Sequence, residues 1–130
     1  MEKLNKAQIK AIKSDSNVVL VIAGAGSGKT TVLTKKIEYM IKEEGINPSS
    51  ILAITFTNKA SNEMKERLHD NLGPFGMDVT VATFHSFAVK VIRENVNYLP
   101  NHDRYFNIID DNDKKRIIKD IIKRLGLSDV

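Results

Sequence analysis

The sequence contains no cysteine and no tryptophan, and only three of its 130 residues are proline. Without cysteine the chain forms no disulfide and offers no thiolate to a metal ion, a composition that fits a reducing compartment. No apolar run approaches the ~18 residues that cross a membrane, and residues 1–6 lack the pattern of a signal peptide. We therefore expect a cytoplasmic protein with no membrane partner.

The overall composition is that of one globular domain, with 42% hydrophobic and 28% charged residues. The net charge of +4 favours a polyanionic partner, although many basic proteins bind no nucleic acid. The three histidines, His69, His85 and His102, lack metal-ligand spacing with carboxylates, so we expect no structural metal site.

A glycine-rich stretch at residues 23–30, Ala-Gly-Ala-Gly-Ser-Gly-Lys-Thr, carries the strongest functional signal. It follows the apolar run 18–22 and precedes a segment with helical periodicity. Glycine accepts the positive φ that turns backbone N–H groups toward an anion, and the next helix adds its positive dipole end. The stretch matches a Walker A phosphate loop except at Ala23, where the strict pattern has glycine.

This interpretation gives the loop residues their roles. Lys29 would reach the β- and γ-phosphates as the catalytic residue, and the Thr30 hydroxyl would bind Mg²⁺. The alternative is a left-handed glycine turn beside an unrelated lysine, but the strand before it and the helix after it favour a nucleotide site. The expected ATP-binding residues of the loop are Ala25, Gly26, Ser27, Gly28, Lys29, Thr30 and Thr31.

Three apolar segments, 18–23, 51–56 and 79–83, predict β-strands that alternate with helices. Strands that are almost wholly apolar indicate a parallel sheet covered on both faces, so the predicted fold class is α/β. Such sheets bind ligands beyond the carboxyl ends of their strands. The phosphate loop, residues 55–60 and residues 83–86 should therefore lie on one rim.

The helices are expected between these strands and after them. Asn5 is a predicted N-cap with Gln8 at the third helical position. The helix after the phosphate loop should end at Gly45, and a second helix should occupy residues 58–72. Another helix should begin after Thr83. The final helix of the chain should end before Gly126. The helical residues expected in the core are Val32, Leu33, Ile37, Met40, Ile41 and Phe84.

Segments 4–8, 23–30, 51–67 and 81–86 together resemble the UvrD/PcrA/Rep group of superfamily 1 DNA helicases. The phosphate loop of that group itself begins Ala-Gly-Ala-Gly, and the run Ala-Ile-Thr-Phe-Thr-Asn-Lys-Ala at 53–60 is highly specific. The resemblance implies a three-layer P-loop NTPase (RecA-like) domain with a parallel sheet, incomplete at its C-terminal side. It also implies ATP and Mg²⁺ as cofactors, 3′-to-5′ translocation on single-stranded DNA, and unwinding at duplex junctions in DNA repair or replication.

By this resemblance Gln8 corresponds to a glutamine that reads the N6/N7 edge of adenine. The alternative is that Gln8 only completes a capping box with Asn5. Two positions depart from the family. Thr31 replaces an arginine that helps to hold the nucleotide, so affinity or base preference should differ. Ser61 replaces alanine, a change expected to be exposed and without a role.

The resemblance also implies a set of DNA contacts on the rim. Phe56 would stack on a base, and Thr57, Asn58, Thr83 and His85 would form hydrogen bonds to phosphate or sugar. Each role has a structural alternative, because an apolar residue such as Phe56 can end its strand in the core and Thr83 can cap the next helix.

The acidic pair of the family's Walker B motif has one candidate match. Residues 108–111 place two isoleucines before two aspartates, but Asp110 or Asp111 as a helix N-cap explains the same residues. The family's arginine fingers and second motor domain have no counterpart in the sequence, so this chain alone should not hydrolyse ATP. The expected division is residues 1–105 as a partial first RecA-like domain, with residues 106–130 beginning a helical insertion.

Other functions stay open: a stand-alone ATP- and DNA-binding module without turnover, or the early part of a helicase–nuclease subunit. Without a Walker B strand beside them, residues 18–22 would leave N–H and C=O groups unpaired. The last helix adds an apolar stripe made of Ile117, Ile118, Ile121, Ile122 and Leu125. We therefore expect this chain to self-associate through the exposed strand edge.

Overall fold

The computed structural model describes residues 4–24, 26–100 and 103–127. Its contacts divide the chain after Val89, within α5, into an N-terminal and a C-terminal unit. Each unit is described by itself below.

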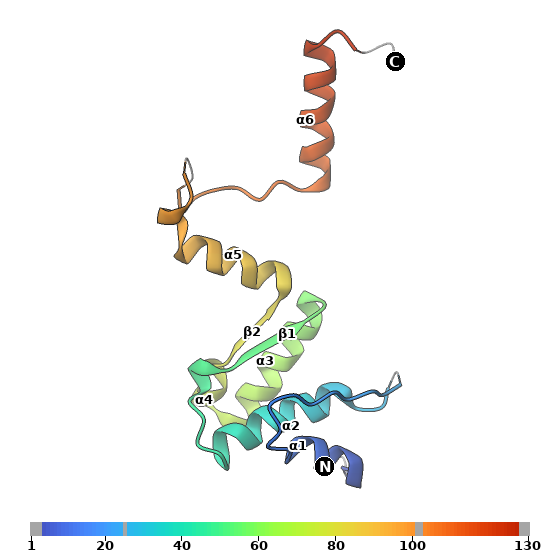
Figure 1. The fold of residues 1–130 in the computed structure, drawn as a ribbon, viewed down its shortest axis with the longest axis vertical. Coiled ribbons are helices and arrows are strands. Elements are labelled where there is room, and N and C mark those ends of the chain that lie inside the picture. Colours follow the sequence, from blue (N-terminus) through green and yellow to red (C-terminus); the bar gives the residue numbers. More distant parts are fainter. Residues whose placement is uncertain (1–3, 25, 101–102, 128–130) are drawn as a thin grey trace. The chain divides into compact units, whose positions relative to one another are not determined.

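From β1 onward, each strand is followed by a helix, as the apolar pattern predicts (Figure 1). The N-terminal unit holds the elements from α1 to β2 and the start of α5. The elements in chain order are α1 Lys6–Ile12, α2 Lys29–Lys42, the 3₁₀ turn η1 Pro48–Ser50, β1 Leu52–Thr55, α3 Asn58–Leu72, α4 Pro74–Met77, β2 Thr80–Thr83, α5 Phe84–Glu94, the 3₁₀ turn η2 Val96–Tyr98, and α6 Asp111–Arg124.

Local side-chain chemistry explains where the helices begin. The Asn5 side chain accepts from the Gln8 backbone N–H, and the Gln8 side chain accepts from the Asn5 N–H, which confirms the predicted capping box of α1. Thr57 caps α3 by accepting from the Ala60 N–H, and Asp110 caps α6. Each cap satisfies N–H groups that the first helical turn leaves without acceptors.

The sheet contains two parallel strands among the described residues, β1 and β2, in a register that pairs Leu52 with Thr80 and Thr55 with Thr83. Helix α3 makes the crossover between them and packs on the sheet (Figure 1). The α/β class and the strands predicted at 51–56 and 79–83 are confirmed.

The core of the N-terminal unit lies between α2, α3 and one face of this sheet. Met64 and Leu68 of α3 are its most deeply buried large side chains. The opposite face of the sheet is less covered. Ala53, on the core face, is 5% exposed, but its neighbour Leu52, on the opposite face, is 45% exposed. Coverage of both faces is therefore not seen for these two strands. The buried cluster consists of Ile37, Ile51, Ala53, Met64, Leu68, Val79 and Val81.

The strand predicted at residues 18–23 is wrong for this structure. The segment has no regular hydrogen-bonding pattern, and the exposed fractions of Val18, Leu20 and Ile22 all exceed four-fifths. A β-strand needs a neighbour to accept and donate its backbone hydrogen bonds. No described segment supplies that neighbour, so the apolar run stays extended and open to solvent.

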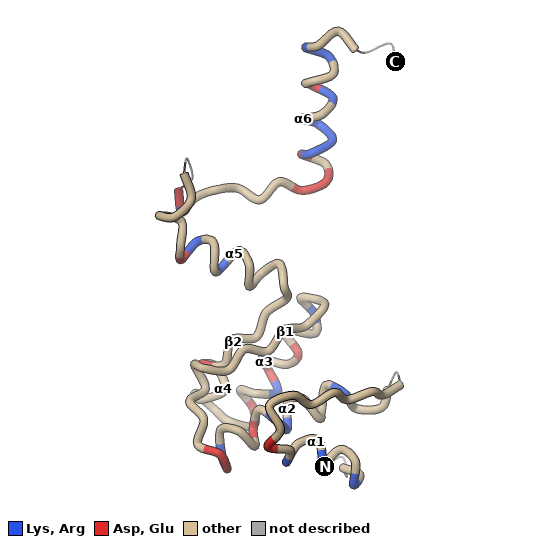
Figure 2. Tube along the Cα trace, in the orientation of Figure 1, with Lys and Arg blue, Asp and Glu red and all other residues tan. Residues whose placement is uncertain are grey.

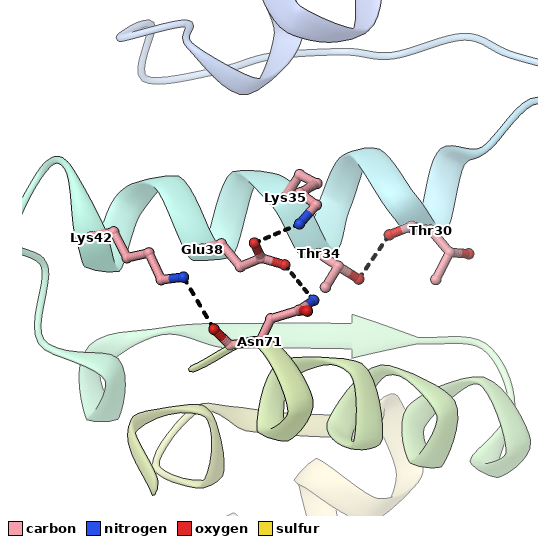
Figure 3. Close-up of polar contacts among 6 residues, drawn as sticks. All are labelled: Thr30, Thr34, Lys35, Glu38, Lys42 and Asn71. Atoms are coloured by element: carbon pink, nitrogen blue, oxygen red, sulfur yellow. Dashed lines mark hydrogen bonds and ion pairs between the residues drawn. The ribbon is translucent and has the colours of Figure 1, made fainter. Parts of the chain in front are cut away.

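Helix α2 meets α3 through polar contacts as well as through the core (Figure 3). Glu38 is buried, and its carboxylate accepts from Lys35 and from the Asn71 side chain, both at 2.8 Å. Lys42 donates to the Asn71 carbonyl at 3.1 Å. Paired in this way, the buried carboxylate avoids the penalty of a desolvated charge without partners.

Burial along the helices departs from the expectation at particular positions. Val32 and Ile37 are buried as predicted, and Met40 and Ile41 are partly buried against the core, but Leu33 is exposed. Phe84 was expected in the core and is 70% exposed instead, because no described residue covers the start of α5.

In the C-terminal unit, α6 keeps its expected amphipathic pattern. Lys and Arg recur along the helix (Figure 2). The apolar stripe from Ile117 to Leu125 is exposed throughout. None of the helices in the described parts of the chain is long and apolar enough to cross a membrane.

Candidate functional site

The phosphate loop has the backbone geometry that its glycines predict. Gly26 and Gly28 adopt φ values of +72° and +82°, a left-handed conformation that residues with a Cβ rarely take. Gly28 is also the N-cap of α2, so the loop passes directly into a helix N-terminus. The Ser27 hydroxyl donates to the Gly24 carbonyl at 2.7 Å and closes the turn. Ala25, an expected ATP-binding residue, lies outside the described residues.

Lys29 folds back over the loop that precedes it. Its ammonium group donates to the Gly24 carbonyl at 2.6 Å and to the Ala23 carbonyl at 3.0 Å. The cation is therefore held inside the loop at the helix N-terminus, beside the backbone that would surround a phosphate. Placing a positive charge and a helix dipole on one loop gives an anion two independent attractions.

Gln8 belongs to the same site, although it lies nineteen positions before its loop partner Ser27 in the sequence. Its Nε2 donates to the Ser27 carbonyl at 3.1 Å, while its Oε1 accepts from the Asn5 N–H at 2.8 Å. The Gln8 side chain therefore caps α1 and contacts the phosphate loop at the same time. A pocket of about 280 Å³ opens here, lined by Leu4, Asn5, Gln8, Gly26, Ser27, Gly28 and Thr31.

Thr30 and Thr31 occupy the first turn of α2. Thr30 is exposed, and its backbone carbonyl accepts from the Thr34 hydroxyl at 2.9 Å (Figure 3). The Thr30 hydroxyl takes no part in that hydrogen bond. Thr31 lines the pocket beside Gln8. The predicted nucleotide-binding residues of the described chain are thus brought together at one place.

The carboxyl ends of β1 and β2 form the second part of the site. Because Thr55 pairs with Thr83, the turns that follow the two strands lie at the same end of the sheet. Figure 3 shows β1 pointing toward the end at which α2 begins, so the phosphate loop and this rim face the same end of the N-terminal unit.

Phe56 is 96% exposed, which excludes the interpretation of this ring as a core residue. Asn58 and His85 are exposed as well. Thr57 is exposed, but its hydroxyl accepts from the Ala60 N–H as the cap of α3. The rim therefore presents the exposed aromatic rings of Phe56 and Phe84 together with exposed polar groups.

Thr83 behaves differently from its neighbours on the rim. It is 7% exposed, and its hydroxyl accepts from the Ser86 N–H at 3.2 Å and donates to the Ser86 hydroxyl at 2.9 Å. The cap interpretation of Thr83 is confirmed, and its side chain presents little surface to a ligand.

The possible Walker B match at residues 108–111 is wrong. Ile108 and Ile109 are about three-fifths exposed rather than buried in a strand, at 61% and 60%. One Asp110 carboxylate oxygen accepts from the N–H groups of Asn112 and Asp113, both at 2.8 Å. Asp110 is therefore the N-cap of α6, and Asp111 is the first residue of that helix.

Sequence reasoning also missed the burial of Ser61. It was expected to be exposed, but it is 4% exposed and its hydroxyl contacts the Thr55 hydroxyl. The helical spacing of Ser61, Met64 and Leu68 places all three on one face of α3. This spacing could have predicted the burial of Ser61, but a small polar side chain does not stand out in an apolar pattern.

The sequence was also compared with known proteins. The family model of the UvrD/REP helicase N-terminal domain matches residues 4–129, almost the entire chain. The chain belongs to the UvrD/REP helicase family. This membership confirms the resemblance on which the site assignments rest.

Curated relatives show the same relationship. The chain is 45% identical to the ATP-dependent DNA helicase PcrA of Bacillus subtilis over 124 residues, which cover 95% of this chain and 17% of that protein. It is 42% identical to PcrA of Staphylococcus aureus (strain Mu50) over 123 residues, with the same shares of each chain covered. The chain thus spans about one-sixth of the length of these relatives.

Proposed function

We propose that this chain is the N-terminal ATP-binding part of a DNA helicase. In this proposal, ATP hydrolysis drives 3′-to-5′ movement along single-stranded DNA and the unwinding of duplex during repair or replication. The family match over residues 4–129 is the observation that carries the proposal. Residues 1–105 would form part of the first motor domain, and residues 106–130 would begin a helical insertion.

The phosphate loop fits a nucleotide because of its own chemistry. Two left-handed glycines bring the backbone close to the helix N-terminus, and Lys29 supplies a cation that now rests on two loop carbonyls. Lys29 and the loop N–H groups would hold the phosphates, Thr30 would hold Mg²⁺, and Gln8 would orient the base. Bound Mg²⁺ would help to neutralise the phosphate charge.

The rim fits a nucleic acid strand for a separate reason. Phe56 offers an uncovered aromatic face, while Asn58 and His85 offer exposed donors at the ends of two paired strands. Base stacking is worth about 1–3 kcal/mol per base, and polar contacts to the backbone fix the register of the strand. We propose that single-stranded DNA crosses this rim.

Replacing Gln8 with alanine should weaken ATP more than GTP, because only a contact with the base edge distinguishes the two nucleotides. Leaving a hydrogen-bond partner unpaired costs about 1–3 kcal/mol, or roughly five- to 150-fold in affinity. The measurement is titration of both nucleotides against both proteins. Asn5→Ala is the matched control, since it breaks the same capping box and keeps the Gln8 amide. Equal losses of ATP and GTP affinity would assign Gln8 to capping alone.

Phe56→Ala and His85→Ala should each lower the affinity for an oligothymidine strand, by about tenfold for Phe56 if one stacked base is lost. ATP affinity should stay unchanged, because neither residue lies in the phosphate loop. Phe75→Ala is the control, since Phe75 is also exposed but lies in α4. Wild-type DNA affinity of the double variant at matched salt would rule out the rim as the DNA path.

Unwinding by the full-length protein tests the whole proposal. Duplexes with a 3′ or a 5′ single-stranded tail are incubated with ATP, and strand separation is followed by fluorescence. Separation that requires the 3′ tail and ATP is the expected result. ATP binding without DNA-stimulated hydrolysis would favour a binding module, and a DNA-cutting activity would favour a helicase–nuclease subunit.

A further inference from the structure

Phe56 projects from the N-terminal unit without support for its own ring. With 96% of its surface exposed, the ring gains almost nothing from packing. The direction of its Cα–Cβ bond is set by the backbone around it, which includes Thr55 and Thr57. A side chain that must meet a base in one orientation binds more weakly when this backbone is free to move.

Two hydroxyl groups, those of Thr55 and Ser61, restrain that backbone by hydrogen bonds. The Thr55 hydroxyl donates to the Thr57 carbonyl at 3.1 Å, spanning Phe56. The Ser61 hydroxyl lies against the same Thr55 oxygen. A hydroxyl has one proton to donate, and Thr55 gives its proton to Thr57, so Ser61 must be the donor to Thr55.

Ser61 is bound to the same turn a second time through its backbone. Its N–H donates to the Thr57 carbonyl at 3.0 Å, so that carbonyl accepts from both Thr55 and Ser61. Ser61 itself is almost completely buried in α3, beside the core residue Met64. The turn that carries Phe56 is thereby tied to a buried residue of α3.

We propose that Ser61 is a positioning residue, which acts through Thr55 to hold Phe56 in the orientation that binds single-stranded DNA. The inference rests on the proposed function for its DNA partner. Its structural part, the fixing of residue 56 by the Ser61 hydroxyl, is independent of DNA.

The first test follows the motion of residue 56 without DNA. The chain has no tryptophan, so Phe56→Trp introduces a single fluorophore at the position of interest. Adding Ser61→Ala or Thr55→Val should increase the amplitude of fast motion in time-resolved anisotropy. Thr55→Ser, which keeps the hydroxyl, should restore the restricted motion. Identical anisotropy decays with and without the Ser61 hydroxyl would overturn the proposal.

The second test is a double-mutant cycle on oligothymidine binding by this chain at fixed salt. Ser61→Ala should weaken binding by about three- to tenfold, the range of one net hydrogen bond. In the Phe56→Ala background the same change should have no effect, since there is no ring left to position. Ser49→Ala, which removes an exposed hydroxyl bonded to Asn47, is the control.

The two tests separate failure of the inference from failure of the proposed function. A loss on Ser61→Ala that persists without Phe56 would mean general destabilisation and would overturn the inference. Equal DNA binding by the wild type and Phe56→Ala would instead refute the DNA role of the rim. In that case the anisotropy measurement still decides whether Ser61 fixes residue 56.

Discussion

Replacing Lys29 with alanine is expected to abolish ATP hydrolysis by the full-length protein. The ammonium group of Lys29 donates hydrogen bonds to the carbonyls of Ala23 and Gly24, at the start of α2. In the proposed function, charge would develop on the transferred phosphoryl group at this place. Removing one such electrostatic partner commonly lowers turnover by about 10²- to 10³-fold. The measurement is steady-state phosphate release with and without single-stranded DNA.

Lys10→Ala is the matched control for Lys29→Ala, because it also removes a lysine but from the exposed surface of α1. It should leave turnover unchanged. Thermal unfolding of both variants separates loss of catalysis from loss of fold. Turnover by a folded Lys29→Ala variant within about tenfold of the wild type would contradict the role of Lys29.

Self-association of this chain is the second large effect that we expect. Residues 18–22 are extended and apolar, and the exposed fractions of Val18, Leu20 and Ile22 are 86%, 82% and 88%. An apolar segment with unpaired N–H and C=O groups is a template for pairing with another chain. Light scattering over a concentration series should show a molecular mass that rises with concentration.

Placing charge on this segment should reverse that association. Leu20→Lys together with Ile22→Lys should keep the chain monomeric, because pairing would bring like charges together and bury them. Ile117→Lys with Ile121→Lys on the exposed stripe of α6 gives the comparison. A wild-type chain that stays monomeric at all concentrations would refute the expectation. If only the α6 substitutions made the chain monomeric, the self-association contact would be assigned to α6 instead of residues 18–22.

The sequence predicted most of what depends on neighbouring residues. The capping box of Asn5 and Gln8 and the cap by Asp110 follow from hydrogen bonds within one turn, so local pattern was sufficient. The left-handed glycines of the phosphate loop are local in the same sense.

Features that depend on distant partners were less predictable. The apolar pattern of residues 18–23 favours a strand, but a strand also requires a neighbour, and none is found among the described residues. Phe84 fits the apolar stripe of α5 yet remains exposed for lack of a covering surface. Burial of Ser61 arose from its register with Met64 and Leu68, while residue type alone suggested an exposed position.

Amide chemical-shift mapping of this chain with MgATP tests the central claim most directly. If the phosphate loop binds nucleotide, the shifts of Gly26, Gly28, Lys29 and Thr30 should change, together with those of Gln8, and Lys29→Ala should abolish the changes. Shifts that stay constant up to millimolar MgATP, or that change equally in the Lys29→Ala variant, would contradict a nucleotide site at this loop.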